Sequence, residues 1–309
     1  MKAVSYRSYG GPEALEYGDR PDPKVGPDTV LIKVRAAAVN PVDWKAQAGY
    51  LDSMLDAVYP VIPGWDVSGV VVRTGPDAPE FEEGDEVIGY VREDFLSRGT
   101  FAEYVGAPVR TLARKPSNLS FEQAAGLPLA GLTAYQTLLG ELNVGKGDTV
   151  LIHAAAGGVG SMAVQLAKHV GARVIGTAGE HNHEYLRGLG AEPVTYGDGL
   201  ADRVRALAPD GVHAVLDLVG GDALTVSPGL LADADSGRLV SIADPAVLGM
   251  GGRFQWVRPD AADLSALSDL AEAGVITVEV AATFPLERTA DAQRLNAEGH
   301  TRGKIVVTM

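Results

Sequence analysis

The sequence predicts an α/β protein with two parts, a mostly β domain and a doubly wound parallel-sheet domain. Short apolar runs, punctuated by Gly and Pro, fill about the first 118 residues. From Asp148 onward, apolar runs alternate with helical patterns. A glycine-rich turn stands where this alternation begins, and 309 residues are enough for two cores.

The apolar runs of the first part predict short strands that close into a barrel-like sheet. They cover residues 30–39, 69–75, 85–91 and 99–105. The pattern changes at Ser120, a residue type typical of a helix N-cap, and helical segments follow from Phe121 and over residues 131–139.

The second part alternates predicted strands with predicted helices. The strands cover residues 149–152, 171–177, 214–219, 238–242 and 303–308, and the clearest helices cover 161–169 and 263–273. Such alternation is typical of a parallel sheet with helices on both faces.

The turn at residues 155–160 predicts a dinucleotide-binding site. It fits the pattern G-x-G-x-x-G except that Ala155 replaces the first glycine. Glycine lets the backbone approach a pyrophosphate, and the following helix offers its free N–H groups and its positive dipole end to that anion. The alternative is a turn with a structural role only, and the short strand at residues 171–177 favours the nucleotide site because it completes a βαβ unit.

Charge and composition exclude several classes of partner. The net charge is −14, from 26 basic and 40 acidic residues, so the chain as a whole repels nucleic acid and anionic membranes. It has no cysteine, which removes disulfides, thiolate nucleophiles and Cys-ligated zinc. The N-terminus lacks the apolar core of a signal peptide, and no apolar run reaches membrane length. A cytoplasmic enzyme is expected.

Motifs along nearly the whole chain resemble those of zinc-independent medium-chain dehydrogenases/reductases, in the quinone oxidoreductase (zeta-crystallin-like) branch. The motifs are AVNPVDWK at 38–45, PGWDVSG at 63–69, GDEV at 84–87, LPLAGLTAY at 127–135 and RGKIV at 302–306, with the turn at Gly157. The resemblance implies a GroES-like catalytic domain over residues 1–119, completed by 261–309, and a Rossmann NADP-binding domain over 120–260. It also implies an active site between the domains and a homodimer paired through an edge strand, here residues 254–257.

The resemblance implies that no metal takes part. Zinc-dependent members carry Cys at the position of Asn40 and His-Glu at the positions of Trp65 and Asp66. One Asn and one Asp do not make a catalytic zinc site, which normally has three good ligands. The pair His181 and His183 is better placed for a cofactor phosphate than for a metal.

The same resemblance assigns two catalytic residues. Asn40 is expected beside the nicotinamide and the substrate, unless it only caps the turn before Pro41. Lys45 is expected to point into the cleft, where its ammonium would stabilise a developing enolate, unless it is a solvated surface lysine. Where relatives often carry Gly, this chain has Ala154, a departure expected to cost little.

The cofactor is expected to be NADPH, with NADH as the alternative. The predicted contacts are Asn40, Thr133, Ala155, Ala156, Gly157, Gly158, Val159, Gly160, Thr177, Gly179, His183, Tyr196 and Lys304. Of these, Thr133, in the segment GLTAY, is expected to hydrogen-bond the nicotinamide carboxamide, with a plain helix-interior threonine as the alternative. The second strand ends without the acid that binds the ribose of NAD, and Gly179, His183 and Tyr196 match positions around the 2′-phosphate. Glu180, just beyond, keeps NADH open.

The expected function is therefore hydride transfer from NADPH to a quinone or another conjugated carbonyl compound, with a small-molecule substrate and no metal. One alternative is an enoyl or alkenal double-bond reductase of the same family. The other is an NADPH-binding protein without turnover. The sequence leaves the identity of the acceptor open.

Overall fold

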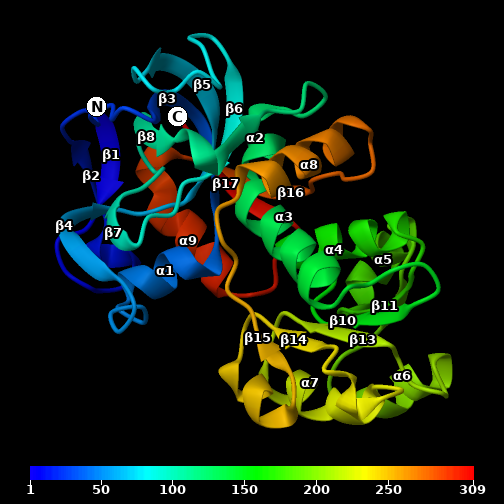
Figure 1. The fold of residues 1–309 in the computed structure, drawn as a ribbon. Coiled ribbons are helices and arrows are strands. Elements are labelled where there is room, and N and C mark those ends of the chain that lie inside the picture. The colour runs from blue at the N-terminus through cyan, green and yellow to red at the C-terminus, as the bar shows by residue number, and fades with distance from the viewer. The chain divides into compact units, whose positions relative to one another are not determined.

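The computed structural model describes all 309 residues, which form two compact units. Unit 1 comprises Met1–Leu129, Pro259–Gly274 and Val278–Met309, and unit 2 comprises Ala130–Arg258 and Val275–Thr277. Unit 1 is built on an antiparallel-rich sheet and unit 2 on a parallel sheet with helices on its faces (Figure 1). The predicted fold class is confirmed.

A seven-stranded sheet forms the centre of unit 1. Its order is β16-β17-β3-β5-β6-β9, with β8 also paired to β3. The strands of the unit are β1 (Lys2–Ser5), β2 (Glu16–Asp19), β3 (Thr29–Val39), β4 (Asp56–Ile62), β5 (Asp66–Thr74), β6 (Glu86–Tyr90), β7 (Phe95–Arg98), β8 (Tyr104–Pro108), β9 (Leu112–Arg114), β16 (Val280–Pro285) and β17 (Lys304–Thr308). Its helices are α1 (Pro41–Gln47), α2 (Phe121–Ala125), α8 (Ala261–Glu272) and α9 (Thr289–Ala297), with 3₁₀ turns at Pro12–Ala14, Val109–Thr111 and Leu286–Arg288.

Strand β3 connects the early strands to the end of the chain. It pairs antiparallel with β5 and β8, and its last residues pair with β17, where Val39 lies opposite Ile305. Exposure alternates along its first half, and every residue from Ala36 to Val39 is buried. The small side chains of Ala36 and Ala38 pack in one apolar cluster with Ala125 of α2, so the sheet is covered closely on that face.

One predicted strand begins later than expected. The sequence predicts a strand over residues 99–105, whereas β8 begins at Tyr104. The backbone N–H groups of Gly99 and Thr100 donate instead to the carbonyls of Ile62 and Gly64, so this segment forms a close crossing of two loops. A side chain at position 99 would lie 2.3 Å from the Pro63 carbonyl oxygen, which explains the glycine there.

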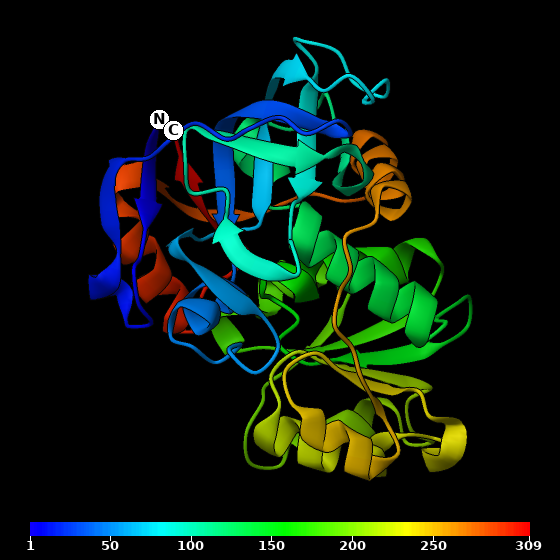
Figure 2. The same cartoon turned by 60° about the vertical axis from the view of Figure 1, so that its left-hand side comes forward.

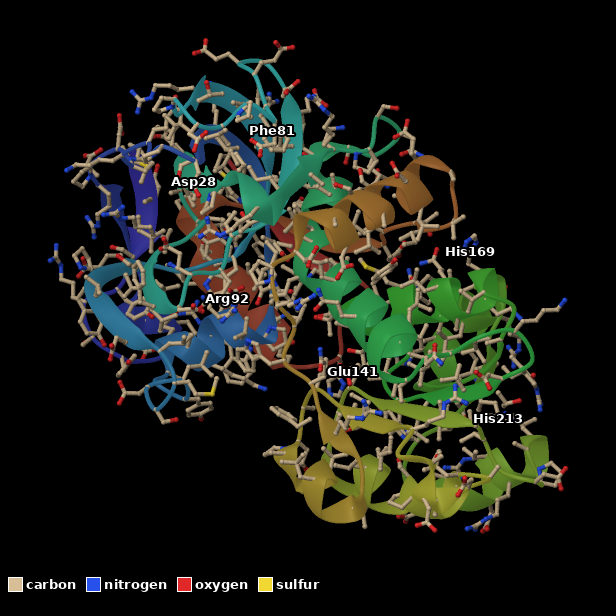
Figure 3. All side chains as sticks on the ribbon, in the orientation of Figure 1. Asp28, Phe81, Arg92, Glu141, His169 and His213 are labelled. Atoms are coloured by element: carbon tan, nitrogen blue, oxygen red, sulfur yellow. The ribbon has the colours of Figure 1, made fainter.

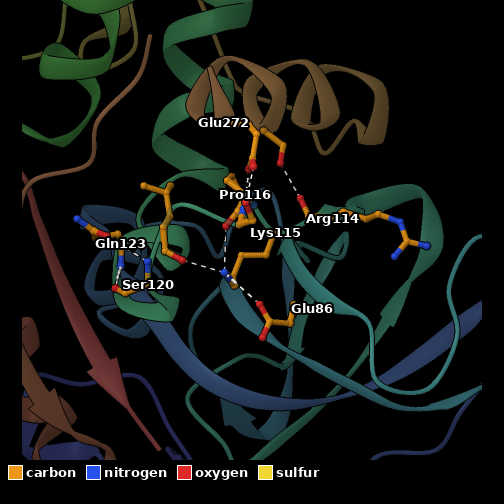
Figure 4. A network of polar contacts seen from close by, with 10 residues as sticks. Glu86, Arg114, Lys115, Pro116, Ser120, Gln123 and Glu272 are labelled. Carbon is orange, nitrogen blue, oxygen red and sulfur yellow. Dashed lines mark hydrogen bonds and ion pairs between the residues drawn. The ribbon is translucent and has the colours of Figure 1, made fainter. Parts of the chain in front are cut away.

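Polar contacts attach α2 to unit 1 (Figure 4). Ser120 caps the helix, because its Oγ accepts from Gln123 N at 3.2 Å and its own N–H donates to Gln123 Oε1 at 3.1 Å. Lys115 Nζ donates to Leu119 O at 2.8 Å and lies 3.1 Å from Glu86 Oε2 on β6. Residues 120–129 group with unit 1, where Ala125 of α2 packs on β3, whereas the sequence expectation starts the nucleotide domain at residue 120.

Unit 2 contains a six-stranded sheet in the order β12-β11-β10-β13-β14-β15, parallel throughout. Helices α4 and α5 lie on one face and α6 and α7 on the other (Figures 1 and 2). The strands are β10 (Thr149–Ile152), β11 (Arg173–Thr177), β12 (Glu192–Val194), β13 (Ala214–Asp217), β14 (Leu239–Ser241) and β15 (Arg253–Phe254). The helices are α4 (Gly158–His169), α5 (His183–Gly188), α6 (Leu200–Leu207) and α7 (Gly221–Val226), with 3₁₀ turns at Glu180–Asn182, Pro228–Leu230, Ala234–Ser236 and Pro245–Met250. Helix α3 (Pro128–Tyr135) crosses the unit boundary and continues as a π-helical turn, Gln136–Glu141.

The edge strand β15 is short. Only Phe254 of the run 254–257 belongs to it, although Gln255 N still donates to Ser241 O at 2.9 Å. Arg253 Nη1 on this strand pairs with Glu141 Oε2 at 2.8 Å, and Glu141 is labelled in Figure 3. The homodimer expected through this edge stays a prediction. None of the helices is both long and apolar enough to cross a membrane.

Candidate active site

Four polar side chains form a buried cluster in unit 1, hereafter the polar cluster: Asn40, Asp43, Asp66 and Lys304. Their exposed fractions are 2%, 3%, 0% and 5% in that order. Asn40 follows β3, and Lys304 opens β17. Because these strands pair at Val39 and Ile305, the sheet brings Lys304 beside Asn40 across 264 positions of sequence.

The amide of Asn40 is held at both ends. Lys304 Nζ donates to Asn40 Oδ1 at 2.5 Å, and Asn40 Nδ2 donates to Asp66 Oδ2 at 2.9 Å. Lys304 Nζ lies 3.9 Å from the same Asp66 oxygen, which closes the triangle. The amide orientation is thereby fixed, because one end faces a cation and the other an anion.

Both acids of the polar cluster also bind backbone N–H groups. Asp66 Oδ1 accepts from Leu129 N at 2.7 Å, which ties the start of α3 to the sheet. Asp43 Oδ2 accepts from Asn40 N at 2.7 Å, within the first turn of α1. Asp43 is thus the structural carboxylate of this turn, and Asp66 is the carboxylate that orients Asn40.

Burial dominates the ionisation of the polar cluster. It raises the pKa of Asp66 to about 6 and that of Asp43 to about 8, while hydrogen bonds and the Lys304 charge oppose both shifts. Burial also lowers the pKa of Lys304, against the attraction of Asp66 and Asp43. The Lys304 ammonium faces two carboxyls. The polar cluster therefore has no net charge when Lys304 and Asp66 are charged and Asp43 carries a proton.

Lys45 lies one helical turn beyond Asn40, on α1. Its side chain is half-buried, and its Nζ lies 5.6 Å from the centroid of the Trp44 ring. Trp44 packs edge-to-face on Tyr50, with ring centroids 6.3 Å apart. The Lys45 ammonium makes no ion pair within the chain, so its charge is available to a ligand.

The polar cluster does not fit a zinc ion. Of the positions that carry zinc ligands in metal-dependent relatives, Asn40 offers only an amide, Trp65 offers no metal-binding atom, and Asp66 already accepts three hydrogen-bonding or charged partners. The chain contains no group of three or more His, Cys, Asp or Glu side chains arranged to hold a metal.

The turn at the end of β10 lies in unit 2. Ala155 N donates to Thr177 O at 2.9 Å, and α4 begins at Gly158 directly after the turn. A side chain at position 157 would meet only the Ala154 carbonyl oxygen, at 3.4 Å, so the protein itself leaves room there. At position 160 it would lie 2.3 Å from the same oxygen, so glycine is required for packing. This cradle fits a dinucleotide pyrophosphate above the N-terminus of α4.

Ala154 adopts a backbone conformation that favours glycine. Its φ is +51°, in the left-handed region that an alanine adopts at a cost of about 1 kcal/mol. Its N–H donates to Thr177 Oγ1 at 3.0 Å, which holds the residue in this conformation.

The residues expected around the 2′-phosphate lie beyond β11 and β12. Because these strands are parallel neighbours, Gly179 and Tyr196 follow them at the same sheet edge. His183 Nε2 lies 3.3 Å from Ala178 O, and the exposed Glu180 begins the 3₁₀ turn. Tyr196 is 54% exposed, and it lies in a loop whose backbone carbonyls accept hydrogen bonds from an arginine.

That arginine, Arg203, was not predicted. Its guanidinium donates to four consecutive backbone carbonyls, those of Thr195, Tyr196, Gly197 and Asp198. Arg203 lies on α6, after the loop whose carbonyls it binds, and no sequence motif indicates this contact.

The predicted site residues thus fall into two groups, each assembled within its own unit. Asn40, Lys45 and Lys304 lie in unit 1. Thr133, buried on α3, lies in unit 2 with the turn residues Ala155, Ala156, Gly157, Gly158, Val159 and Gly160 and with Thr177, Gly179, His183 and Tyr196. The sequence also gave no role to Asp66, which stands inside the motif at 63–69, or to His153, which directly follows the strand predicted at 149–152. The sequence signal that could have identified His153 is that it is a polar residue at the end of an apolar strand.

Residues 26–117 match the family model of the alcohol dehydrogenase GroES-like domain, and residues 189–307 match that of a zinc-binding dehydrogenase. An NADPH-dependent alkenal/one oxidoreductase of Arabidopsis thaliana is 38% identical, over 99% of this chain and 79% of that protein. A chloroplast envelope quinone oxidoreductase homolog of the same plant is 32% identical, over 99% of this chain and 98% of that protein.

Solved structures agree. The quinone oxidoreductase from Coxiella burnetii has a TM-score of 0.87 at 36% identity, over 100% of this chain and 99% of that one. An NAD-dependent alcohol dehydrogenase has a TM-score of 0.89 at 32% identity, over 100% of both chains. Two plant relatives carry chloroplast in their names, and the cytoplasmic location expected for this chain stays a prediction. The chain belongs to the medium-chain dehydrogenase/reductase family of oxidoreductases, in its zinc-independent quinone oxidoreductase branch.

Proposed function

We propose that this oxidoreductase transfers hydride from NADPH to a quinone or another conjugated carbonyl compound, without a metal. The observation that carries the proposal is the Asn40 amide held between Lys304 and Asp66, at a position where metal-dependent relatives bind zinc. An oriented amide and a nearby ammonium suit a reaction in which the acceptor needs only positioning and polarisation.

The cofactor is a nicotinamide dinucleotide, which supplies the hydride when bound. In the proposal, the turn at Gly157 and the N-terminus of α4 bind its pyrophosphate, and Thr133 bonds the carboxamide of the nicotinamide. Asn40 and Lys304 contact the nicotinamide end, and Lys45 stabilises negative charge that develops on the acceptor oxygen. Within unit 1, Asn40 and Lys304 are held in position by the hydrogen bonds described above.

NADPH is the proposed form of the cofactor. The loop after β11 carries no acid before Glu180, whose exposed side chain is free to turn to solvent. His183 and Tyr196 supply hydrogen-bond donors, and the exposed Arg187 adds positive charge. One relative is named as NADPH-dependent, while one similar structure is named as NAD-dependent, so the choice needs a direct test.

Fluorescence titration with both cofactors decides the choice. We expect NADPH to bind more tightly than NADH, and Glu180→Ala to strengthen NADPH binding modestly, by about 1 kcal/mol or less. His183→Ala should weaken NADPH and leave NADH nearly unchanged. Tighter NADH in the wild type would mean that Glu180 holds the ribose diol.

The activity itself is tested by steady-state oxidation of NADPH against a panel of quinones, enones and alkenals. The proposal predicts turnover with quinones, which a strong chelator leaves unchanged. Turnover with alkenals alone would favour the double-bond reductase, the activity in the name of one relative. Tight NADPH binding with no turnover on any acceptor would indicate a binding protein.

The proposal includes the expected organisation of the chain. The catalytic domain comprises residues 1–119 and 261–309, the nucleotide domain 120–260, and two chains pair through the β15 edge. An unpaired sheet edge is a liability in water, which supports the pairing. Sedimentation at micromolar concentration should show a dimer, and a monomer would count against it.

A further inference from the structure

His153 is a fully buried side chain between the first strand of unit 2 and the turn, with 0% exposure. Its backbone N–H donates to Leu216 O of β13 at 2.9 Å, so the residue continues the sheet beyond β10. Its ring lies between two hydroxyls: Nε2 is 3.0 Å from Ser227 Oγ, and Nδ1 is 3.4 Å from Thr177 Oγ1. The proposed function uses neither His153 nor Ser227.

The surrounding hydrogen bonds fix the direction of each contact. Ser227 Oγ donates to Ala223 O at 2.7 Å, so it must accept the hydrogen of His153 Nε2. Thr177 Oγ1 accepts from Ala154 N at 3.0 Å, so its own hydrogen is available to His153 Nδ1. The neutral ring with hydrogen on Nε2 therefore satisfies the whole chain of bonds.

The local charges are consistent with a neutral ring. Burial lowers the pKa of His153 to about 4, and the charge of Asp217 opposes this shift. The Asp217 carboxylate lies on β13 and is occupied by the N–H groups of Val219 and Gly220 and by Ser241 Oγ at 2.6 Å. It therefore has its own partners and does not need the histidine proton.

We infer that Ser227, His153 and Thr177 form a relay of positioning residues that holds Ala154 in its left-handed conformation and so shapes the turn for the cofactor pyrophosphate. An alanine persists in this conformation only where its surroundings enforce it. The Ala154 N–H has Thr177 Oγ1 as its acceptor, and His153 fixes the rotation of that hydroxyl. The inference rests on the proposed binding of a nicotinamide dinucleotide at this turn.

A double-mutant cycle between Ser227→Ala and Ala154→Gly tests the relay. Ser227→Ala removes the acceptor for His153 Nε2 and should lower NADPH affinity about fivefold. In the Ala154→Gly background the same change should cost less than about twofold, because glycine adopts a positive φ without support. Equal losses in the two backgrounds would overturn the inference, since the serine would then act independently of Ala154.

Thr177 provides the conservative rescue. Thr177→Val should lower NADPH affinity about tenfold, and Thr177→Ser, which keeps the hydroxyl, should restore it. The control is Thr137→Val, which alters a buried threonine whose Oγ1 has no partner. It should leave NADPH affinity unchanged. Failure of the serine to rescue would assign the loss to shape and contradict the relay.

Two measurements without cofactor separate this inference from the proposed function. In urea unfolding, the destabilisation caused by Ser227→Ala should at least halve in the Ala154→Gly background, whereas additive effects would refute the relay. The nitrogen resonances of the wild-type His153 ring should show hydrogen on Nε2 alone, and hydrogen on Nδ1 would also refute it. If these results hold but the wild type does not bind NADPH, the proposed function fails and the relay remains as a structural device.

Discussion

The polar cluster of unit 1 is built from polar side chains, whereas the glycine turn of unit 2 is built mainly from backbone groups. The polar cluster joins charged and amide side chains from three separate segments, all nearly inaccessible to water. The turn is one continuous segment that presents backbone N–H groups and small side chains. Removing a side chain from the first should cost stability, whereas adding one to the second at position 157 should cost mainly ligand binding.

This difference follows from what each region does with charge. The charges of the polar cluster are buried and paired with one another. The loss of one partner therefore leaves the remaining charged groups buried without a partner, which is strongly destabilising. In the proposed function, the N-terminus of α4 offers its free N–H groups to an anion that is supplied from outside. Variants can therefore separate folding from function, and those below follow in decreasing order of expected effect.

The largest effect is expected for Asp66→Ala. The change leaves Lys304 Nζ, Asn40 Nδ2 and Leu129 N without their shared acceptor in a site with 0% exposure. The free energy of unfolding in urea should fall by about 3–5 kcal/mol. The control is Asp28→Ala, which breaks an exposed pair with Arg110 and should cost about 0.5 kcal/mol or less. Equal losses in the two variants would mean that the polar cluster is not a stabilising unit.

Lys45→Met should act on turnover rather than on folding. Lys45 has no ion pair, and methionine retains most of the apolar stem that lies against Trp44. We expect kcat to fall about tenfold, or about 1.4 kcal/mol, if the ammonium stabilises charge in the transition state. NADPH affinity and urea stability should stay unchanged. An unchanged kcat would assign Lys45 to the surface.

Asp43→Asn should change the pH dependence of stability. The pKa of Asp43 is raised by burial from its ordinary value of 3.8 to about 8, so between these values only the unfolded chain loses the proton. The wild type should therefore lose stability as the pH rises through this window. Between about pH 5 and pH 8, the asparagine variant should lose less, by at least about 1 kcal/mol. Parallel stability curves would show that Asp43 keeps an ordinary pKa in the fold.

The smallest effect is expected for Ala154→Gly. Glycine relieves the strain of φ +51°, but it also increases the entropy of the unfolded chain. The free energy of unfolding should therefore rise by about 0.5 kcal/mol, measured in urea beside Ala156→Gly as the control, which lacks a positive φ and should be destabilised. A loss of stability in the first variant would mean that Ala154 is not strained.

The sequence also predicted the two regions to different extents. The turn is local, so the glycines at 157 and 160 and the flanking apolar runs predict its place on a strand, turn and helix. The contact of Lys304 with Asn40 depends on the pairing of β17 with β3, which no local pattern encodes. The resemblance to a family named both residues, but it gave no role to Asp66.

Other features lay beyond local patterns for similar reasons. The strand at residues 99–105 was misplaced because Gly99 serves a close crossing of two loops, which is a tertiary contact. The left-handed Ala154 was missed because its conformation depends on Thr177, on the neighbouring strand. Both cases show a backbone position that is set by a distant segment.

The central claim, that the turn binds the cofactor, is tested most directly by calorimetric titration of the wild type and Gly157→Val with NADPH. Because a Cβ at position 157 meets the protein only at 3.4 Å, the variant should fold and keep most of its urea stability, apart from the small cost of valine at a helix N-cap. Its NADPH affinity should fall by at least about 2 kcal/mol, since the valine occupies the space of the pyrophosphate. Gly188→Val, at an open position of α5, should bind as the wild type does. A folded Gly157→Val that binds NADPH with wild-type affinity would contradict the account and leave the turn with a structural role only.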